Sequence, residues 1–214
     1  MPSFGEYIVA LSDVRSNLLE SVTRTMNFDT VLIFGPQGSG KSTQGKRLAE
    51  KLGFLFWDTG AILREILKEG GPLAQKISAI ERGVLLPDEV IIEVMKGRLS
   101  SITPTQGIVF DGIPRRLQQA QFLMDFFRGQ KRKKPVSIFI DLPREDSYAR
   151  LLHRAGVENR PDDTPEGIAT RLQYYEETMS PVIEYLKQQT YFITIDGRPT
   201  IEEITQNIDR ALGI

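Results

Sequence analysis

Short apolar runs alternate with longer amphipathic segments along most of the chain. Five runs are short enough to be buried strands, namely residues 31–34, 54–57, 108–110, 136–140 and 191–195. Segments of helical length lie between them, and strands separated by helices form right-handed βαβ units. The pattern therefore predicts an α/β fold with a five-stranded parallel sheet that helices cover on both faces.

Prolines and capping residues mark where several helices begin. Thr164-Pro165-Glu166 is typical of the first turn of a long helix, and Pro143 stands at the start of an earlier one. Thr200 and Glu203 have the spacing of a capping box, which predicts the start of the last helix.

Two stretches interrupt the alternation of strands and helices. Between residues 58 and 107, three helical patterns (61–69, 73–82 and 88–99) follow one another without a strand, and 154–164 is a short polar loop. Such insertions can be surface decoration. They are also typical of moving covers over phosphoryl-transfer sites, which exclude water when the substrate is bound.

The composition indicates a soluble enzyme with one sizeable domain. The chain has 214 residues, 40% of them hydrophobic, and a net charge of −1, so neither a nucleic acid nor a membrane is expected as its main partner. It contains no cysteine, which excludes disulfides and cysteine-ligated zinc and is compatible with a reducing cytosol. Because it shows neither a membrane-length apolar stretch nor a signal-peptide pattern, we expect a cytoplasmic protein.

The segment from Gly35 to Thr43 carries the strongest chemical signal. Gly-Pro-Gln-Gly-Ser-Gly-Lys-Ser-Thr completes the phosphate-loop pattern Gly-x4-Gly-Lys-Ser between a predicted strand and the helical segment 44–52. Its glycines let backbone N–H groups point at an anion, Lys41 adds a charge for the β- and γ-phosphates, and Ser42 offers a hydroxyl to Mg²⁺. The alternative is a glycine-rich turn with an incidental lysine, which the strand–loop–helix context disfavours. The expected ATP-binding residues are Gly38, Ser39, Gly40, Lys41, Ser42 and Thr43.

A second phosphate-site motif begins at Asp111, directly after the apolar run 108–110. An apolar strand that ends in aspartate resembles a Walker-B element, whose carboxylate holds Mg²⁺ directly or through water. Here it continues as Asp111-Gly112-Ile113-Pro114-Arg115, with Gln119 four residues further on. This segment resembles the Asp-Gly-Phe-Pro-Arg motif of the adenylate kinase family of nucleoside monophosphate kinases. The resemblance extends from about residue 31 to the C-terminus.

The resemblance implies a binding site for a nucleoside monophosphate. Thr59-Gly60-x-x-x-Arg64 is similar to the family segment that holds the monophosphate, with Arg64 at its phosphate and Thr59 near its base. Gly83-Val84-Leu85-Leu86 resembles the turn whose backbone contacts that base. The residues implied for AMP binding are Thr59, Arg64, Leu86, Gly112, Arg115, Gln119, Arg160 and Arg171.

The resemblance also implies a donor site and a set of phosphate-binding arginines. Arg150 and Arg154 are four residues apart, on one face of a predicted helix, and resemble the pair that meets ATP. Arg198 belongs to a segment, 196–199, that resembles the loop whose backbone contacts the donor adenine. Arg160-x-Asp162-Asp163, followed by Arg171, resembles the lid and hinge. The implied catalytic residues are Lys41, Arg115, Arg154, Arg160 and Arg171.

Taken individually, these arginines have simpler interpretations. Arg150 and Arg154 can be the solvated face of a helix, and Arg160 can form a surface salt bridge of little energetic value. Their joint agreement with the family motifs favours the functional interpretation. Arginine suits the chemistry because its planar, permanently charged fork binds phosphate in two places at once.

The resemblance also divides the chain. Residues 29–214 correspond to a kinase domain of the P-loop NTPase type, with a helical monophosphate-binding insertion at about 58–107 and a short lid at about 154–164. A short lid implies no zinc. Residues 1–28 lie outside the resemblance, and we expect a helical extension that packs on the core, mediates self-association or contacts a partner.

The sequence departs from the family at the expected metal site. Asp58-Thr59-Gly60-Ala61 stands where the family usually has Ser-Thr-Gly-Asp, so Ala61 lacks a carboxylate expected near the Mg²⁺ hydration shell. The sequence leaves open whether Asp58 compensates. Ser42 stands where adenylate kinases commonly have glycine, and it adds a metal ligand; Ser42 and Asp111 are the expected Mg²⁺ residues, partly through water.

The expected function is transfer of the γ-phosphoryl group of Mg·ATP to a nucleoside monophosphate by a monomeric kinase. AMP is the expected acceptor because Thr59 and Gln119 are the residue types that adenylate kinases use, whereas kinases for pyrimidine monophosphates tend to have alanine at the first position. The alternatives are a kinase for another nucleoside monophosphate or other small acceptor, and a nucleotide-binding regulatory protein without catalysis. Ala61 supports only the last of these.

Overall fold

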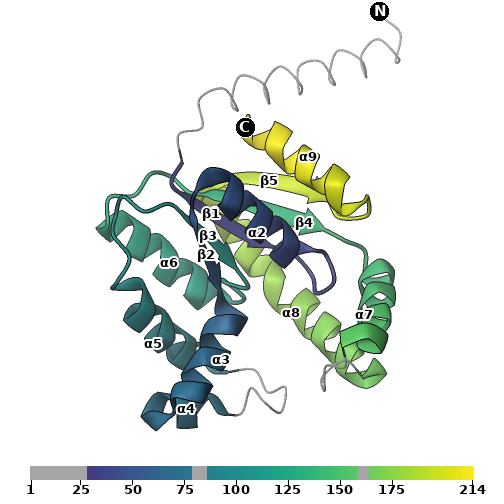
Figure 1. The fold of residues 1–214 in the computed structure, drawn as a ribbon, viewed down its shortest axis with the longest axis horizontal. Helices are drawn as coiled ribbons and strands as arrows, with labels where there is room; N and C mark the ends of the chain where they lie inside the picture. Colours follow the sequence, from purple (N-terminus) through teal and green to yellow (C-terminus); the bar gives the residue numbers. More distant parts are fainter. Residues whose placement is uncertain (1–27, 79–85, 159–163) are drawn as a thin grey trace, which may run out of the picture.

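A computed structural model describes residues 28–78, 86–158 and 164–214 of the chain. Its centre is a sheet of five parallel strands in the order β2-β3-β1-β4-β5 (Figure 1). The predicted parallel α/β sheet is therefore confirmed. The strands are β1 Thr30–Phe34, β2 Leu55–Asp58, β3 Ile108–Asp111, β4 Val136–Asp141 and β5 Tyr191–Asp196.

Helices cover both faces of the sheet. The central strands carry apolar side chains on both faces, and each face is buried by helices. Val31 and Ile33 of β1 pack toward α2 (Lys41–Leu52) and α9 (Ile201–Leu212). Leu32 and Phe34 point to the opposite face, where α6 (Leu117–Gly129) and α8 (Pro165–Gln189) lie (Figure 1). Strands buried on both faces read as continuous apolar runs, which is why their positions could be predicted.

The insertion between β2 and β3 forms a helical unit with its own small core. It consists of α3 (Thr59–Glu69), α4 (Gly71–Ile77) and α5 (Asp88–Leu99), which extend from one end of the sheet (Figure 1). Its buried residues are Leu63, Ile66, Ala74, Ile77, Leu86 and Val94. The three predicted helices are present, although α4 is shorter than the predicted 73–82, and residues 79–85 lie outside the described part.

The segment predicted as a polar loop at 154–164 begins later than expected. α7 runs from Arg144 to Glu158, so the prediction of a loop at 155–158 was wrong. Leu151, in the middle of α7, is fully buried against α8 and anchors the helix. After Pro143, the next proline in the sequence is Pro161. Residues 159–163, which include Arg160, lie outside the described residues.

The three helix starts predicted from prolines and capping residues agree with the structure to within a residue. The Thr164 hydroxyl caps α8 by accepting from the Gly167 N–H at 3.1 Å, and Thr200 and Glu203 form both hydrogen bonds of a capping box on α9. Pro143 immediately precedes α7 rather than starting it. The proposed N-terminal extension lies outside the described part except for Phe28, whose ring meets Phe54 edge-on. Across the three described ranges, no helix is long and apolar enough to cross a membrane.

Candidate active site

The loop between β1 and α2 has a backbone that requires glycine. Gly35 has φ 156°, and an added Cβ would lie 2.4 Å from the Ile140 carbonyl oxygen. Gly40 precedes α2 with φ 84°, a left-handed conformation that avoids a steric penalty only without a side chain. The first turn of α2 contains no acid, so its N-terminus remains electropositive. The predicted phosphate loop thus sits at a helix N-terminus that favours anions.

Lys41 is the first residue of α2 and lies under the same loop, donating from Nζ to the Pro36 carbonyl at 3.2 Å. Desolvation lowers its pKa from 10.5 to about 8; Asp111 opposes this, whereas the charges of Arg115 and Arg154 reinforce it. The fold therefore brings three of the predicted catalytic cations close to one another. An anion bound among them would relieve their mutual repulsion.

Asp111 is the carboxylate at the centre of this charge cluster. It ends β3, is 4% exposed, and is paired in register with Ile33 of β1, the strand that leads into the phosphate loop. Burial raises its pKa, while the charge of Lys41 and the hydroxyl of Ser42 lower it. Its Oδ1 atom is buried and has no hydrogen-bond partner among the described residues.

These groups fit a magnesium ion held mainly by substrate and water. Carboxylate and hydroxyl oxygens are hard ligands, and the unpartnered Asp111 oxygen beside the Ser42 hydroxyl is such a ligand. The described residues contain no group of three or more histidine, cysteine, aspartate or glutamate side chains that could hold a metal by themselves. This agrees with Mg²⁺, which keeps several waters and uses one or two protein carboxylates.

Thr59 and Gln119 are both buried and both anchored by hydrogen bonds. The Thr59 hydroxyl donates to the Asp111 carbonyl at 3.0 Å and accepts from Trp57 Nε1 at 3.2 Å. Gln119 Oε1 accepts from the Arg115 backbone N–H at 2.8 Å, and its Nε2 donates to Asp88 Oδ1 at 2.7 Å. Because one partner only donates and the other only accepts, the orientation of this amide is fixed.

The remaining predicted arginines lie around the phosphate loop. Arg115 donates from Nε to the Gly112 carbonyl at 2.9 Å. Burial lowers the pKa of Arg115, Asp111 opposes this, and the charge of Arg171 lowers the pKa further. Arg150 donates to the Gly38 carbonyl at 3.4 Å and to the Arg198 carbonyl at 3.0 Å, so it links the phosphate loop to the loop after β5.

The side chains of Arg198 and Leu86 lie apart from this cluster, and Arg64 lies at the start of the helical insertion. The Arg198 guanidinium pairs with Asp196 at 2.7 Å, and only its backbone meets Arg150. Leu86 is buried within the core of the helical insertion. Arg64 lies against Gly60 at the start of α3. Arg160 and the rest of the segment 83–86 are outside the described residues, so the structure does not place them.

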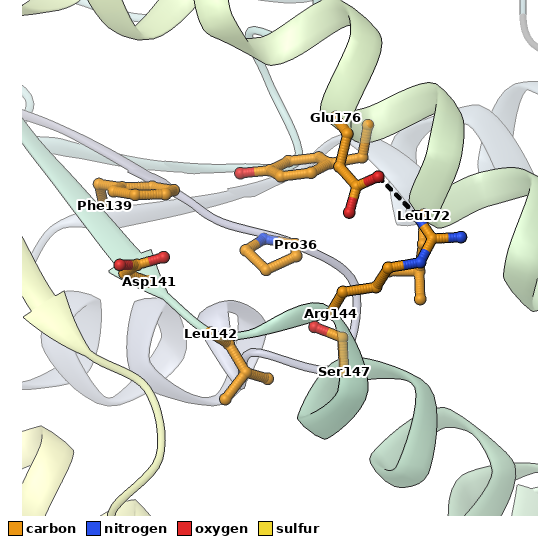
Figure 2. Close-up of a pocket in the computed structure, with 9 residues that line it drawn as sticks. Pro36, Phe139, Asp141, Leu142, Arg144, Ser147, Leu172 and Glu176 are labelled. Atoms are coloured by element: carbon orange, nitrogen blue, oxygen red, sulfur yellow. Dashed lines mark hydrogen bonds and ion pairs between the residues drawn. The ribbon is translucent and has the colours of Figure 1, made fainter.

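A small cavity of about 180 Å³ adjoins the phosphate loop on the side of α7 and α8. Figure 2 shows Pro36 at its centre and the ion pair between Arg144 and Glu176 at one side. Ser147 and Tyr175 also line it, and their hydroxyls are buried without a hydrogen-bond partner in the described part of the chain. The sequence contains no motif that would have predicted this cavity.

The comparisons with known proteins agree with the geometry. Residues 33–191 match the family model of adenylate kinase. An adenylate kinase of Thermus thermophilus is 36% identical over 185 residues, which cover 86% of this chain and 97% of that protein. The chain belongs to the adenylate kinase family. Adenylate kinases of a Caulobacter species and of Phocaeicola vulgatus are 36% and 35% identical over 86% and 85% of this chain, with 98% and 97% of their own lengths covered.

Two side chains of this adenylate kinase family member were not among the predicted site residues. Asp88 begins α5 and holds the Gln119 amide, across 31 residues of sequence. Asp58 ends β2 and is paired in register with Asp111. The sequence raised Asp58 only as a possible substitute for the carboxylate missing at Ala61, whereas nothing in the sequence pattern indicated the contact of Asp88.

Proposed function

We propose that this protein transfers the γ-phosphoryl group of ATP to AMP, producing two molecules of ADP. In this reaction the bond from the γ-phosphorus to the bridging oxygen breaks as an AMP phosphate oxygen attacks. The observation that carries the proposal is the cluster of Lys41, Arg115 and Arg154 around Asp111, at the mouth of a phosphate loop. Phosphoryl transfer needs positioning and charge neutralisation rather than a covalent partner, and such a cluster supplies both.

Each predicted residue then has a role. The backbone N–H groups of residues 38–43 bind the ATP phosphates. Lys41 stabilises the negative charge that develops on the bridging oxygen in the transition state. Arg115, Arg154, Arg160 and Arg171 neutralise the oxygens of the transferred group. Arg64 binds the AMP phosphate, while Thr59, Leu86, Gly112 and Gln119 form the base site. Arg150 and the loop of Arg198 hold the donor nucleotide.

Ser42 and Asp111 are the residues that would hold Mg²⁺, partly through water, and the unpartnered Asp111 Oδ1 supports this assignment. When bound, Mg²⁺ neutralises charge on the β- and γ-phosphate oxygens. No role for zinc follows from this site. A monomeric state and a cytoplasmic location complete the proposal, and light scattering measures the first of them.

The geometry of Gln119 supports adenine as the acceptor base. After its contacts with Arg115 and Asp88, the amide keeps one N–H donor and one oxygen lone pair for a ligand. Adenine presents a matching acceptor and donor on one edge. A base with donor and acceptor exchanged on that edge would place its donor against the amide N–H and its acceptor against the amide oxygen.

A coupled assay of ADP formation with ATP and AMP, CMP, UMP or GMP tests the proposal. We expect kcat/KM for AMP to exceed that for the other acceptors. UMP or CMP turnover at least as efficient as that of AMP would refute the adenine assignment and leave a kinase for another monophosphate. Binding of ATP without turnover of any acceptor would instead identify a non-catalytic nucleotide-binding protein.

A further inference from the structure

Two carboxylates lie next to each other at the carboxyl edge of the sheet. β2 and β3 pair in parallel with Asp58 opposite Asp111, and residues paired in this way place their side chains on the same face. The charge of Asp58 acts on both Asp111 and Arg115, so it faces the charge cluster of the active site. Asp111 Oδ1, buried and unpartnered in the described structure, lies in the same group.

Asp58 has one evident structural role, which does not require its charge. Its Oδ1 accepts from the Ala61 N–H at 2.9 Å and caps α3. Asparagine or serine would cap the helix equally well. An aspartate here adds a second negative charge beside a buried carboxylate. Lys41 and Arg115 act against this repulsion, and a divalent cation bound beside the two carboxylates would act against it further.

Water reaches Asp58, as a water-mediated contact with a metal requires. Asp58 is partly exposed and borders an open hollow of about 470 Å³ that Ala61 also lines. The side chain of Ala61 carries no ligand atom, so Asp58 is the carboxylate that the start of α3 offers to this edge. Lys46 also lines the hollow, and its ammonium group lies over the Phe56 ring.

We propose that Asp58 is a positioning residue for the divalent cation that accompanies the nucleotides. Its carboxylate binds metal-held water beside Asp111 and Ser42, and it supplies the negative charge that position 61 does not. The inference rests on the proposed phosphoryl transfer, and it predicts that the charge of Asp58, rather than its capping hydrogen bond, determines the metal affinity of the nucleotide complex.

The test measures Mn²⁺ affinity by electron paramagnetic resonance of the free ion, in a complex with a bisubstrate analogue that joins two adenosines through five phosphates. Asp58→Asn keeps the helix cap and removes the charge, and we expect Mn²⁺ affinity to fall about tenfold or more, as for other residues that orient a metal's ligands. Glu65→Gln removes an acid from the same hollow and should change Mn²⁺ affinity less than about twofold. Asp58→Asn combined with Ala61→Asp should recover most of the loss.

A second measurement separates the metal role from a merely structural one. Without metal, Asp58→Asn should bind the analogue as tightly as the wild type or more tightly, because one negative charge near its phosphates is gone. Equal weakening with and without metal would overturn the inference, as would unchanged Mn²⁺ affinity. Failure of the wild type to bind the analogue with Mn²⁺ would refute the proposed function itself, and the inference with it.

Discussion

Replacing Lys41 by methionine should abolish turnover and at the same time stabilise the empty protein. Lys41 lies in a crowded cationic site, where desolvation and the charges of Arg115 and Arg154 lower its pKa from 10.5 to about 8. A lowered lysine pKa means that the charged form of the side chain is less stable in the folded protein than in the unfolded one. Methionine keeps the apolar stem and removes the charge.

The magnitude follows from that pKa. The interval between 10.5 and about 8 corresponds to roughly 3 kcal/mol of unfavourable free energy for the charged folded form. Lys41 is partly exposed, and its hydrogen bond to the Pro36 carbonyl is lost in the variant, so we expect a net gain of about 1–2 kcal/mol, or about 2–8 °C in Tm. Turnover should fall about a hundredfold or more, because a preorganised contact with the transition state is lost.

The pH dependence has a definite sign. Between about pH 8 and 10.5 the unfolded lysine binds more protons than the folded one, so wild-type stability rises with pH in this window. The gain from Lys41→Met is therefore full below pH 8 and disappears above pH 10.5. Thermal unfolding of both proteins at pH 7 and pH 10, with the coupled ADP assay at pH 7, tests this. A gain that is equal at both pH values, or a loss of stability at pH 7, would refute the electrostatic reasoning. Near-wild-type turnover would show that the phosphate loop is not the active site.

Three other perturbations test separate parts of the structure. Asp88→Ala frees the Gln119 amide, and KM for AMP should rise about tenfold, with KM for ATP unchanged in initial-rate measurements; a parallel rise in both would indicate a general packing defect. Thr200→Ala removes the capping box of α9 and should lower the free energy of unfolding by about 1 kcal/mol in urea titrations without altering kcat. Finally, the bisubstrate analogue should slow hydrogen exchange in 150–175 and 60–90 together, because its phosphates draw separate cationic segments inward. Protection confined to 35–43 would mean that the covers do not close.

The strands could be predicted because both of their faces are buried. The apolar pattern did not, however, include the last residue of β2, β3, β4 or β5, which stands at the ligand-binding edge of the sheet. Apolar periodicity placed the strand ends at 57, 110, 140 and 195, whereas each strand continues for one more residue into an aspartate: Asp58, Asp111, Asp141 and Asp196. A polar residue ends an apolar run by definition. In a parallel sheet, however, that next residue stands at the edge where ligands bind.

The long-range contacts of the site could not be predicted from the sequence for a different reason. Motif spacing identified Gln119, but the orientation of its amide depends on Asp88 and on the Arg115 backbone, which only the packing of α5 against α6 brings together. The end of α7 was also misplaced: the helix, whose middle packs on α8 through Leu151, continues through residues 155–158, where local polarity suggested a loop. In both cases tertiary packing overrides the local signal.

The same charges that make the site suitable for catalysis make it unfavourable when empty. Lys41, Arg115, Arg154 and Arg171 lie close enough to influence one another's ionisation, and Asp111 is the carboxylate to which both Lys41 and Arg115 respond. Asp58 adds a second carboxylate to this group. Nucleotide phosphates bring several negative charges at once, so binding relieves the repulsion among cations, while a divalent cation relieves that between the two aspartates. We therefore expect nucleotide phosphates and a divalent cation to strengthen each other's binding at this site, which links metal affinity at Asp58 to phosphate binding at Lys41.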